Sequence, residues 1–224
     1  MAGRISYYGN IVKDGLVLFL DAAKRDSYPG VGTVWNDISG FRNNGTLTNG
    51  PTFNSLNGGS VVFDGVDDYS TLPNIPIRTN LFTIDIWFKM NGNQSSNAAL
   101  LSVNAAASSN NIQISFINSN EILFFYNGLT FIGFATSFSL DVWYNIMITR
   151  DTNNDIKTYV NGSQTNTINY NANYNFTEQL RIGVNRGNDK YFKGNISVTR
   201  LYVNKFLSAT EVLQNYNATK GRYL

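Results

Sequence analysis

The sequence predicts an all-β protein, a two-sheet antiparallel jelly-roll sandwich with one short C-terminal helix. Three observations support this fold class. Short segments with alternating apolar residues recur along the 224 residues, turn-forming Asn-Gly pairs separate several of them, and the one clear helix signal lies near the C-terminus. Apolar residues make up 42% of the chain, which is enough to build a large core.

The N-terminal quarter of the chain is expected to contain an arm, a buried strand and a long loop. Residues 1–13 are predicted to be an N-terminal arm, and residues 14–224 a single sandwich domain. The continuous apolar run of residues 16–20 predicts a fully buried strand. Residues 21–59 would make a long loop for a compact domain, so one or two short strands are expected inside it, with residues 45–47 as a candidate.

The clearest strand signals lie in residues 81–88 and 143–168. In the first segment, the even-numbered apolar residues from Phe82 to Phe88 share one face, while Trp87 lies on the other. The second segment alternates across two turns, the latter at an Asn-Gly pair, and predicts an antiparallel meander of three strands. Further strands are expected at residues 60–63, 111–117, 121–126, 130–134, 179–184 and 195–203.

The helix signal near the C-terminus is a capping box. Ser208 and Glu211 have the spacing at which the Ser hydroxyl accepts the N3 backbone N–H and the Glu carboxylate reaches back to the cap. An apolar stripe follows from Val212 to Tyr216, and Gly221 is expected to end the helix at its C′ position.

The residue types that are absent exclude most catalytic chemistries. The chain has no His and no Cys, which removes Ser-His-Asp and Cys-His nucleophiles, imidazole metal sites and any ordinary zinc site. A pair of carboxylates of the glycosidase kind remains open. However, Glu121, Glu178 and Glu211 are the only glutamates, and no two of them share a strand at close spacing. The sequence therefore predicts a protein that is not an enzyme.

The segment FDGVDDY places Asp64, Asp67 and Asp68 within five residues of a chain that is otherwise poor in charge. One interpretation is a turn, because Asp-Gly favours turns and Asp side chains accept backbone N–H groups in Asx turns. The other is a calcium site, since Ca²⁺ prefers six to eight oxygen ligands. Such a site could be completed by loop carboxylates from Asp21, Asp26 or Asp37.

Aromatic residues in loops are candidates for glycan binding. Their rings can cover the C–H face of a sugar while neighbouring amides bond its hydroxyl groups, although such residues are equally common in protein interfaces. Trp87 and Trp143 lie in apolar strands and are expected in the core. Trp35 either contacts a ligand or anchors its loop. The glycan-binding candidates are Trp35, Tyr28, Tyr170 and Tyr174.

Charge and hydropathy exclude two classes of partner. The net charge is +2, the sequence pI is about 8.7, and no more than two Lys or Arg residues are adjacent, which argues against nucleic-acid binding. No apolar run approaches the roughly 18 residues of a membrane span. Residues 1–10 lack the apolar stretch of a signal peptide.

Six segments in order carry a resemblance to a known family. They are GLVLFLDA (15–22), WNDISG to GPTF (35–53), VVFDGVDDY (61–69), FTIDIWFK (82–89), WYNIMITRD to KTYVNG (143–162) and FLSATEVLQNYNATKGRY (206–223). Together they resemble the laminin-G-like, concanavalin A-like jelly-roll family, and in particular its versions in tailed-phage virion proteins. The resemblance implies two facing antiparallel sheets, glycan or protein binding on a concave face or at rim loops, and in many members a calcium ion at the rim.

The expected function is therefore that of a non-enzymatic virion component. Its partners would be other virion proteins and, as an additional ligand, a glycan of the host surface. A symmetric homo-oligomer is compatible with this role. The alternatives are a dedicated carbohydrate-binding lectin and, less favoured by the residues, a glycosidase.

Overall fold

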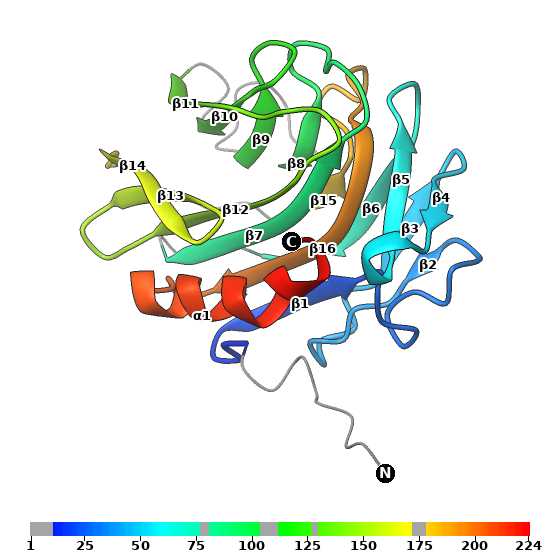
Figure 1. Ribbon diagram of the computed structural model, residues 1–224. Coiled ribbons are helices and arrows are strands. Elements are labelled where there is room, and N and C mark those ends of the chain that lie inside the picture. The colour runs from blue at the N-terminus through cyan, green and yellow to red at the C-terminus, as the bar shows by residue number, and fades with distance from the viewer. Residues whose placement is uncertain (1–10, 77–80, 104–111, 127–129, 172–177) are drawn as a thin grey trace.

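A computed structural model describes residues 11–76, 81–103, 112–126, 130–171 and 178–224, with residues 122–126 and 130–136 described by their backbone (Figure 1). Two antiparallel β-sheets face each other, and one short helix lies near the C-terminus. The all-β sandwich predicted from the sequence is confirmed.

Sheet A has the strand order β14-β13-β12-β7-β16-β5-β4, and β1 also pairs with β16. Its strands are β1 (Leu16–Asp21), β4 (Thr52–Asn54), β5 (Ser60–Asp64), β7 (Phe82–Met90), β12 (Trp143–Arg150), β13 (Asp155–Val160), β14 (Ser163–Asn169) and β16 (Lys193–Val203). The predicted meander is thus present as β12, β13 and β14.

Sheet B has the strand order β11-β10-β9-β8-β15-β6-β3-β2. Its strands are β2 (Val34–Trp35), β3 (Gly45–Thr48), β6 (Tyr69–Asn74), β8 (Ala99–Val103), β9 (Ile112–Phe116), β10 (Glu121–Tyr126), β11 (Thr130–Ser137) and β15 (Gln179–Ile182). The long loop of residues 21–59 therefore contains three short strands, β2, β3 and β4, and the expected strand at residues 45–47 is β3.

The longest strand, β16, organises sheet A. One of its edges pairs with β7 along nearly the whole strand. Its other edge is shared, because the first part pairs with β5 and the second part with β1. This arrangement brings β1, near the start of the chain, beside one of the last strands.

Between the sheets lies the main hydrophobic core, and the strand periodicity predicts which residues enter it. Phe82, Ile84, Ile86 and Phe88 of β7 are buried in this core, as their shared face requires. Trp87 points the other way and is buried in a second apolar cluster. The expectation that Trp87 and Trp143 are core residues is confirmed.

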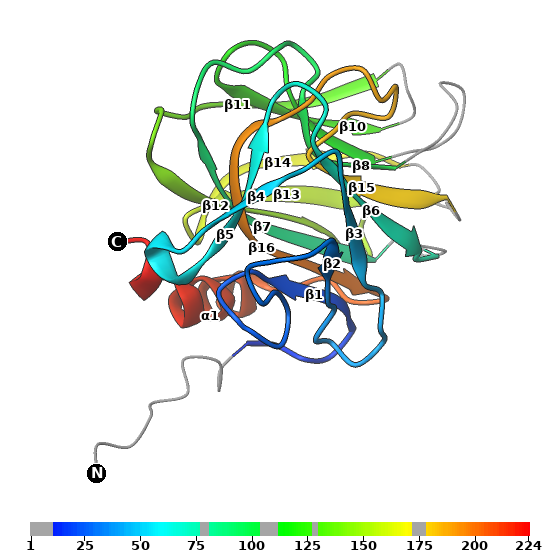
Figure 2. The ribbon, with the colours of Figure 1, turned by 90° about the vertical axis from the view of Figure 1, so that its right-hand side faces the viewer.

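That second cluster lies on the outer face of sheet A, beneath the helix α1 (Ala209–Thr219). Figure 1 shows α1 and β1 along β16, on the side away from β8 and β9, and Figure 2 keeps both on the same side of β16 after a 90° turn. The indole Nε1 of Trp87 donates to Thr219 Oγ1 at 2.9 Å, and its ring stacks on Tyr223 with 4.1 Å between centroids. The helix therefore covers one face of sheet A, and among the described residues no α-helix packs on the outer face of sheet B.

Both helix ends can be compared with the sequence signals. The capping box is present, with the Ser208 backbone N–H donating to Glu211 Oε2 at 2.8 Å and the Glu211 N–H donating to Ser208 Oγ at 3.3 Å. The predicted stop at Gly221 is wrong. The chain continues from Lys220 in right-handed backbone into the 3₁₀ helix η2 (Lys220–Arg222), and Gly221 lies inside that turn.

The N-terminal arm is described only in part. Residues 1–10 lie outside the described residues. Ile11 is buried, and the Val12 backbone N–H donates to Asn215 Oδ1 of α1 at 2.9 Å. The last residues of the predicted arm, Ile11 and Val12, therefore pack on the domain.

Candidate functional site

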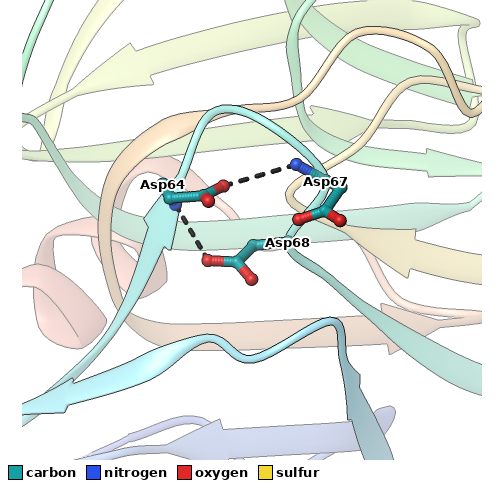
Figure 3. A group of neighbouring side chains, drawn as sticks. All are labelled: Asp64, Asp67 and Asp68. Carbon is teal, nitrogen blue, oxygen red and sulfur yellow. Dashed lines mark hydrogen bonds between the residues drawn. The ribbon is translucent and has the colours of Figure 1, made fainter.

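The turn between β5 and β6 brings the three aspartates of FDGVDDY together (Figure 3). Asp64 Oδ1 accepts the backbone N–H of Val66 at 2.7 Å and that of Asp67 at 3.4 Å. Asp68 Oδ2 accepts the N–H of Asp64 at 3.0 Å. Gly65 has a φ of 80°, which glycine adopts without steric strain. The Asx-turn interpretation is confirmed by these bonds.

The same three carboxylates are a candidate cation site. One oxygen from each lies within 4.8 Å of the others, and no other group of three such ligands occurs in the described part of the chain. Asp68 is only 4% exposed, and burial raises its pKa, an effect that the Asp64 N–H opposes and the charges of Asp64 and Asp67 reinforce. An all-oxygen donor set fits Ca²⁺ better than zinc. Two of the donors are already shared with backbone N–H groups, so the fit to six or more ligands is partial.

The carboxylates expected to complete this site lie elsewhere. Asp21 forms a bidentate ion pair with Arg222, with both N–O distances at 2.8 Å. Asp37 organises a different loop, described below. Neither these residues nor Asp26 joins the aspartates of the β5–β6 turn.

Two of the four proposed glycan-binding aromatics are buried, and the prediction that they offer a ring to a ligand is contradicted. Trp35 is 0% exposed and Tyr28 is 3% exposed. The Tyr28 hydroxyl donates to the carbonyl of Gly32 at 2.9 Å, and its ring meets Phe53 edge-on at 5.7 Å. Both residues anchor the long loop to the core, because the loop folds back over them.

The other two candidates remain as predictions. Tyr170 is half-buried and packs against the edge of the main core. Tyr174 lies outside the described residues.

An aromatic residue that the sequence reasoning missed is exposed in the same loop. Phe41 has 64% of its surface in solvent and stands between the turn signals Ser39-Gly40 and Asn43-Asn44. Its position among turn residues could have predicted this exposure, since a residue at a tight turn is more often exposed than one next to a strand.

The turn that carries Phe41 is held by Asp37. Asp37 Oδ1 accepts the backbone N–H groups of Phe19 at 2.8 Å and Ser39 at 2.9 Å, and Oδ2 accepts the N–H of Asn43 at 2.9 Å. Arg42 has a φ of 61°, an uncommon value for a residue with a Cβ. Strained backbone persists only where its surroundings determine it, so residues 37–44 form a well-defined turn.

Two hollows lie on either side of this turn. One has a volume of about 260 Å³ and is lined by Phe41, Asn43, Asn74, Pro76 and the apolar side chains Val17, Ile75 and Val203. The other has about 310 Å³ and is more polar, with Arg42, Asn44, Thr46, Thr71 and Gln179 among its lining residues. An exposed ring thus lines a mostly apolar hollow with two asparagines, and a second hollow with amide and hydroxyl groups lies next to the same turn, which suits a polar ligand with an apolar face.

Two of the three glutamates, Glu121 and Glu211, have structural roles. Glu211 caps α1 and pairs with Lys205 at 2.7 Å. Glu121 accepts a hydrogen bond from the amide of Asn118 at 2.6 Å, next to a turn. Within the described residues, none of the helices is long and apolar enough to cross a membrane.

Comparison with known proteins identifies relatives of this fold. The model of a family described as the concanavalin A-like lectin/glucanases superfamily matches residues 64–213. No curated protein sequence matches the chain.

Three solved structures illustrate the similarity. Domain 4 of AbnA, a GH43 extracellular arabinanase from Geobacillus stearothermophilus, in complex with arabinotriose, is 18% identical with a TM-score of 0.72, covering 90% of this chain and 98% of that one. A botulinum neurotoxin type C structure, described as dependent on two ganglioside molecules for cell entry, is 14% identical with a TM-score of 0.70, covering 93% and 52%. The binding domain of botulinum neurotoxin DC, in complex with rat synaptotagmin II, is 17% identical with a TM-score of 0.71, covering 93% and 52%.

The lengths of these relatives differ. The chain spans nearly all of the arabinanase domain and about half of each neurotoxin structure. At these identities the similarity establishes the fold.

Proposed function

Because the chain belongs to the concanavalin A-like lectin/glucanases superfamily, we propose that it is a non-enzymatic binding protein whose ligand is a glycan. The observation that carries the proposal is the Phe41 turn between its two hollows. The ring of Phe41 would stack on the C–H face of a sugar, and the amides of Asn43, Asn74 and Gln179 would bond its hydroxyl groups.

The relatives and the residue content support this proposal in different ways. The arabinanase domain was solved with arabinotriose, and cell entry of the type C neurotoxin depends on two gangliosides, so proteins that contain similar sandwiches are associated with glycans. The absence of His, the capping role of Glu211 and the turn contact of Glu121 favour binding over catalysis. A glycosidase would require the turn aspartates as its catalytic carboxylates. Asp64 and Asp68 already accept hydrogen bonds from backbone N–H groups, which gives them a structural role.

Binding to an array of immobilised oligosaccharides tests the proposal. We expect the wild-type chain to bind a defined subset, and Phe41→Ala to weaken that binding by roughly tenfold, because a stacked ring contributes about 1–2 kcal/mol. Leu56→Ala is the matched control, since Leu56 is 69% exposed and does not line either hollow. A wild-type chain that binds no glycan, with or without Ca²⁺, would refute the proposal.

We place this binding protein on the virion of a tailed phage, as a decoration or fibre component that contacts other virion proteins. The ordered motifs of the sequence support this placement through their resemblance to phage members of the family. Mass spectrometry of purified particles should detect the chain. Its absence from particles, together with glycan binding by the isolated protein, would favour the alternative of a dedicated lectin.

A further inference from the structure

Arg181 lies in the middle of the outer face of sheet B. Its neighbours in β15, Leu180 and Ile182, are buried in the main core, so the Arg181 side chain leaves the sheet on the opposite side. Its strand partners are Thr71 of β6 and Ser102 of β8, which share that outer face. In the described part of the chain no α-helix covers this face, because α1 packs against sheet A.

The guanidinium of Arg181 is largely unsatisfied. Its Nε and Nη1 atoms are buried and have no hydrogen-bond partner. Among the described residues it forms no ion pair, and its guanidinium carbon lies 5.9 Å from the centre of the Tyr69 ring. A buried donor without an acceptor carries its full desolvation penalty, so such a group is retained at a functional site more readily than at a structural one.

Nearby carboxylates do not neutralise this cation. Burial raises the pKa of Tyr191, and the charges of Asp67 and Asp189 raise it further while Arg181 lowers it, which places these groups around one tyrosine. Asp189 accepts a hydrogen bond from the Asn185 amide at 2.9 Å. Neither aspartate is among the ion pairs of the described residues.

Arg181 is linked to the polar hollow beside the Phe41 turn through its strand partner. Thr71, its strand partner, lines that hollow together with Arg42 and Gln179. Thr46, opposite Thr71 on β3, lines it as well. Thr71 is therefore the strand partner of Arg181 and lines the same hollow as Arg42.

We propose that the glycan bound at this face is acidic, and that Arg181 binds the carboxylate or sulfate group of one sugar. This inference rests on the proposed function and specifies the ligand class of the same surface. The guanidinium supplies a delocalised positive charge and N–H donors to such an anion, and Arg42 adds positive charge at the edge of the hollow. The neighbouring threonines and Gln179 would bond the sugar hydroxyls.

Calorimetric titrations with three probes test this assignment: an oligogalacturonate, a sulfated galactan oligosaccharide and arabinotriose as a neutral sugar. We expect one of the acidic probes to bind at least tenfold more tightly than arabinotriose, and its affinity to fall as NaCl is raised from 50 to 500 mM. The two acidic probes distinguish a carboxylate ligand from a sulfate ligand. Competition by inorganic phosphate separates recognition of a free anion from recognition of a sugar that bears one.

Arg181→Gln should weaken binding of the preferred acidic probe by about tenfold or more while leaving the melting temperature unchanged or higher, because it removes an unsatisfied buried cation. Arg181→Lys should give an intermediate affinity, since it keeps the charge and loses the planar guanidinium. Arg25→Gln, an exposed arginine outside the hollow, is the matched control for net charge.

Two results would overturn the assignment without touching the proposed function. One is equal binding of neutral and acidic probes by the wild type. The other is an Arg181→Gln variant that binds the acidic probe like the wild type. A lowered melting temperature with unchanged affinity would assign Arg181 a structural role.

Discussion

At the scale of single residues, the aspartates of the β5–β6 turn differ in the hydrogen bonds that they form with the backbone. Asp64 accepts two backbone N–H groups, and Asp68 is buried and accepts one. Asp67 is exposed, and its backbone carbonyl accepts a bond from the Asn49 amide at 2.9 Å. Three neighbouring residues of one type therefore have separate roles in one turn.

This difference predicts unequal effects on stability. Asp64→Ala should lower the free energy of unfolding by about 1–2 kcal/mol, because backbone donors in the turn lose their acceptor. Asp67→Ala changes the same charge in the same turn and should have an effect within about 0.5 kcal/mol. Urea denaturation of both variants measures this, and equal losses would contradict the turn interpretation.

The same turn also gives a test for calcium. A bound ion at 100 times its Kd would add about 2.7 kcal/mol to the stability of the folded state. Melting curves in EDTA and in millimolar CaCl₂ should then differ, and Asp67→Ala should remove the difference. Identical curves for the wild-type protein would reject a calcium site there.

At the scale of elements, the turn between β12 and β13 is organised by Asp151. Its Oδ1 accepts the backbone N–H groups of Asn153 at 2.9 Å and Asp155 at 3.1 Å, while Oδ2 pairs with Lys157 Nζ at 2.7 Å. Burial by itself raises the pKa of Asp151, but Lys157 and the two N–H groups outweigh it and hold the pKa below its ordinary value of 3.8. The ionised carboxylate therefore stabilises the hairpin.

The sign of the pH dependence follows from this lowered pKa. A carboxyl group with a lower pKa in the folded state stabilises the protein above its unfolded-state pKa of about 4 and loses that contribution as the pH falls through the folded value. Asp151→Asn should reduce the free energy of unfolding by about 1–3 kcal/mol at pH 7, and the deficit should shrink below pH 4. Chemical denaturation at both pH values measures it, with the exposed Asp26→Asn as a control. A deficit independent of pH would contradict the assignment.

At the scale of the whole molecule, the second apolar cluster joins the two ends of the chain to sheet A. At its centre, Arg200 of β16 pairs with Asp85 of β7 at 2.6 Å, and both side chains are fully buried. The Asn145 amide donates to the same carboxylate at 2.7 Å, and the Arg200 guanidinium lies 4.8 Å from the centre of the Phe19 ring in β1. This pair therefore connects β7, β12 and β16 with β1, the N-terminal strand that pairs with β16 in the same sheet.

Breaking this pair should be strongly destabilising. Asp85→Asn should lower the free energy of unfolding by about 3–5 kcal/mol, because Arg200 is left buried without its counter-charge, whereas the double variant Asp85→Leu/Arg200→Met should recover much of the loss. Asp14→Asn, which removes the mostly exposed partner of Lys205, should have an effect below about 1 kcal/mol. Denaturant titration distinguishes these cases, and a double variant no more stable than Asp85→Asn would disprove the explanation.

Local signals in the sequence determined the strands, their faces and the start of the helix. Alternation places Phe82 and Trp87 on opposite faces of one strand, and the Ser208–Glu211 box acts over a single turn. Each of these features depends on interactions between residues a few positions apart, so the local sequence is enough to predict it. The family motifs identified the superfamily for the same reason, because they are short and ordered.

The tertiary structure decided which loop residues face solvent and which polar groups remain unsatisfied. Trp35 and Phe41 belong to one loop, yet Trp35 is buried and Phe41 exposed because Asp37 ties the loop to Phe19, 18 positions away. Arg181 looks ordinary in the sequence, and its missing partners become visible only when strands from distant parts of the chain surround it. The burial of a side chain and the hydrogen bonds of its polar atoms depend on neighbours that are distant in the sequence. A local sequence pattern therefore cannot predict them.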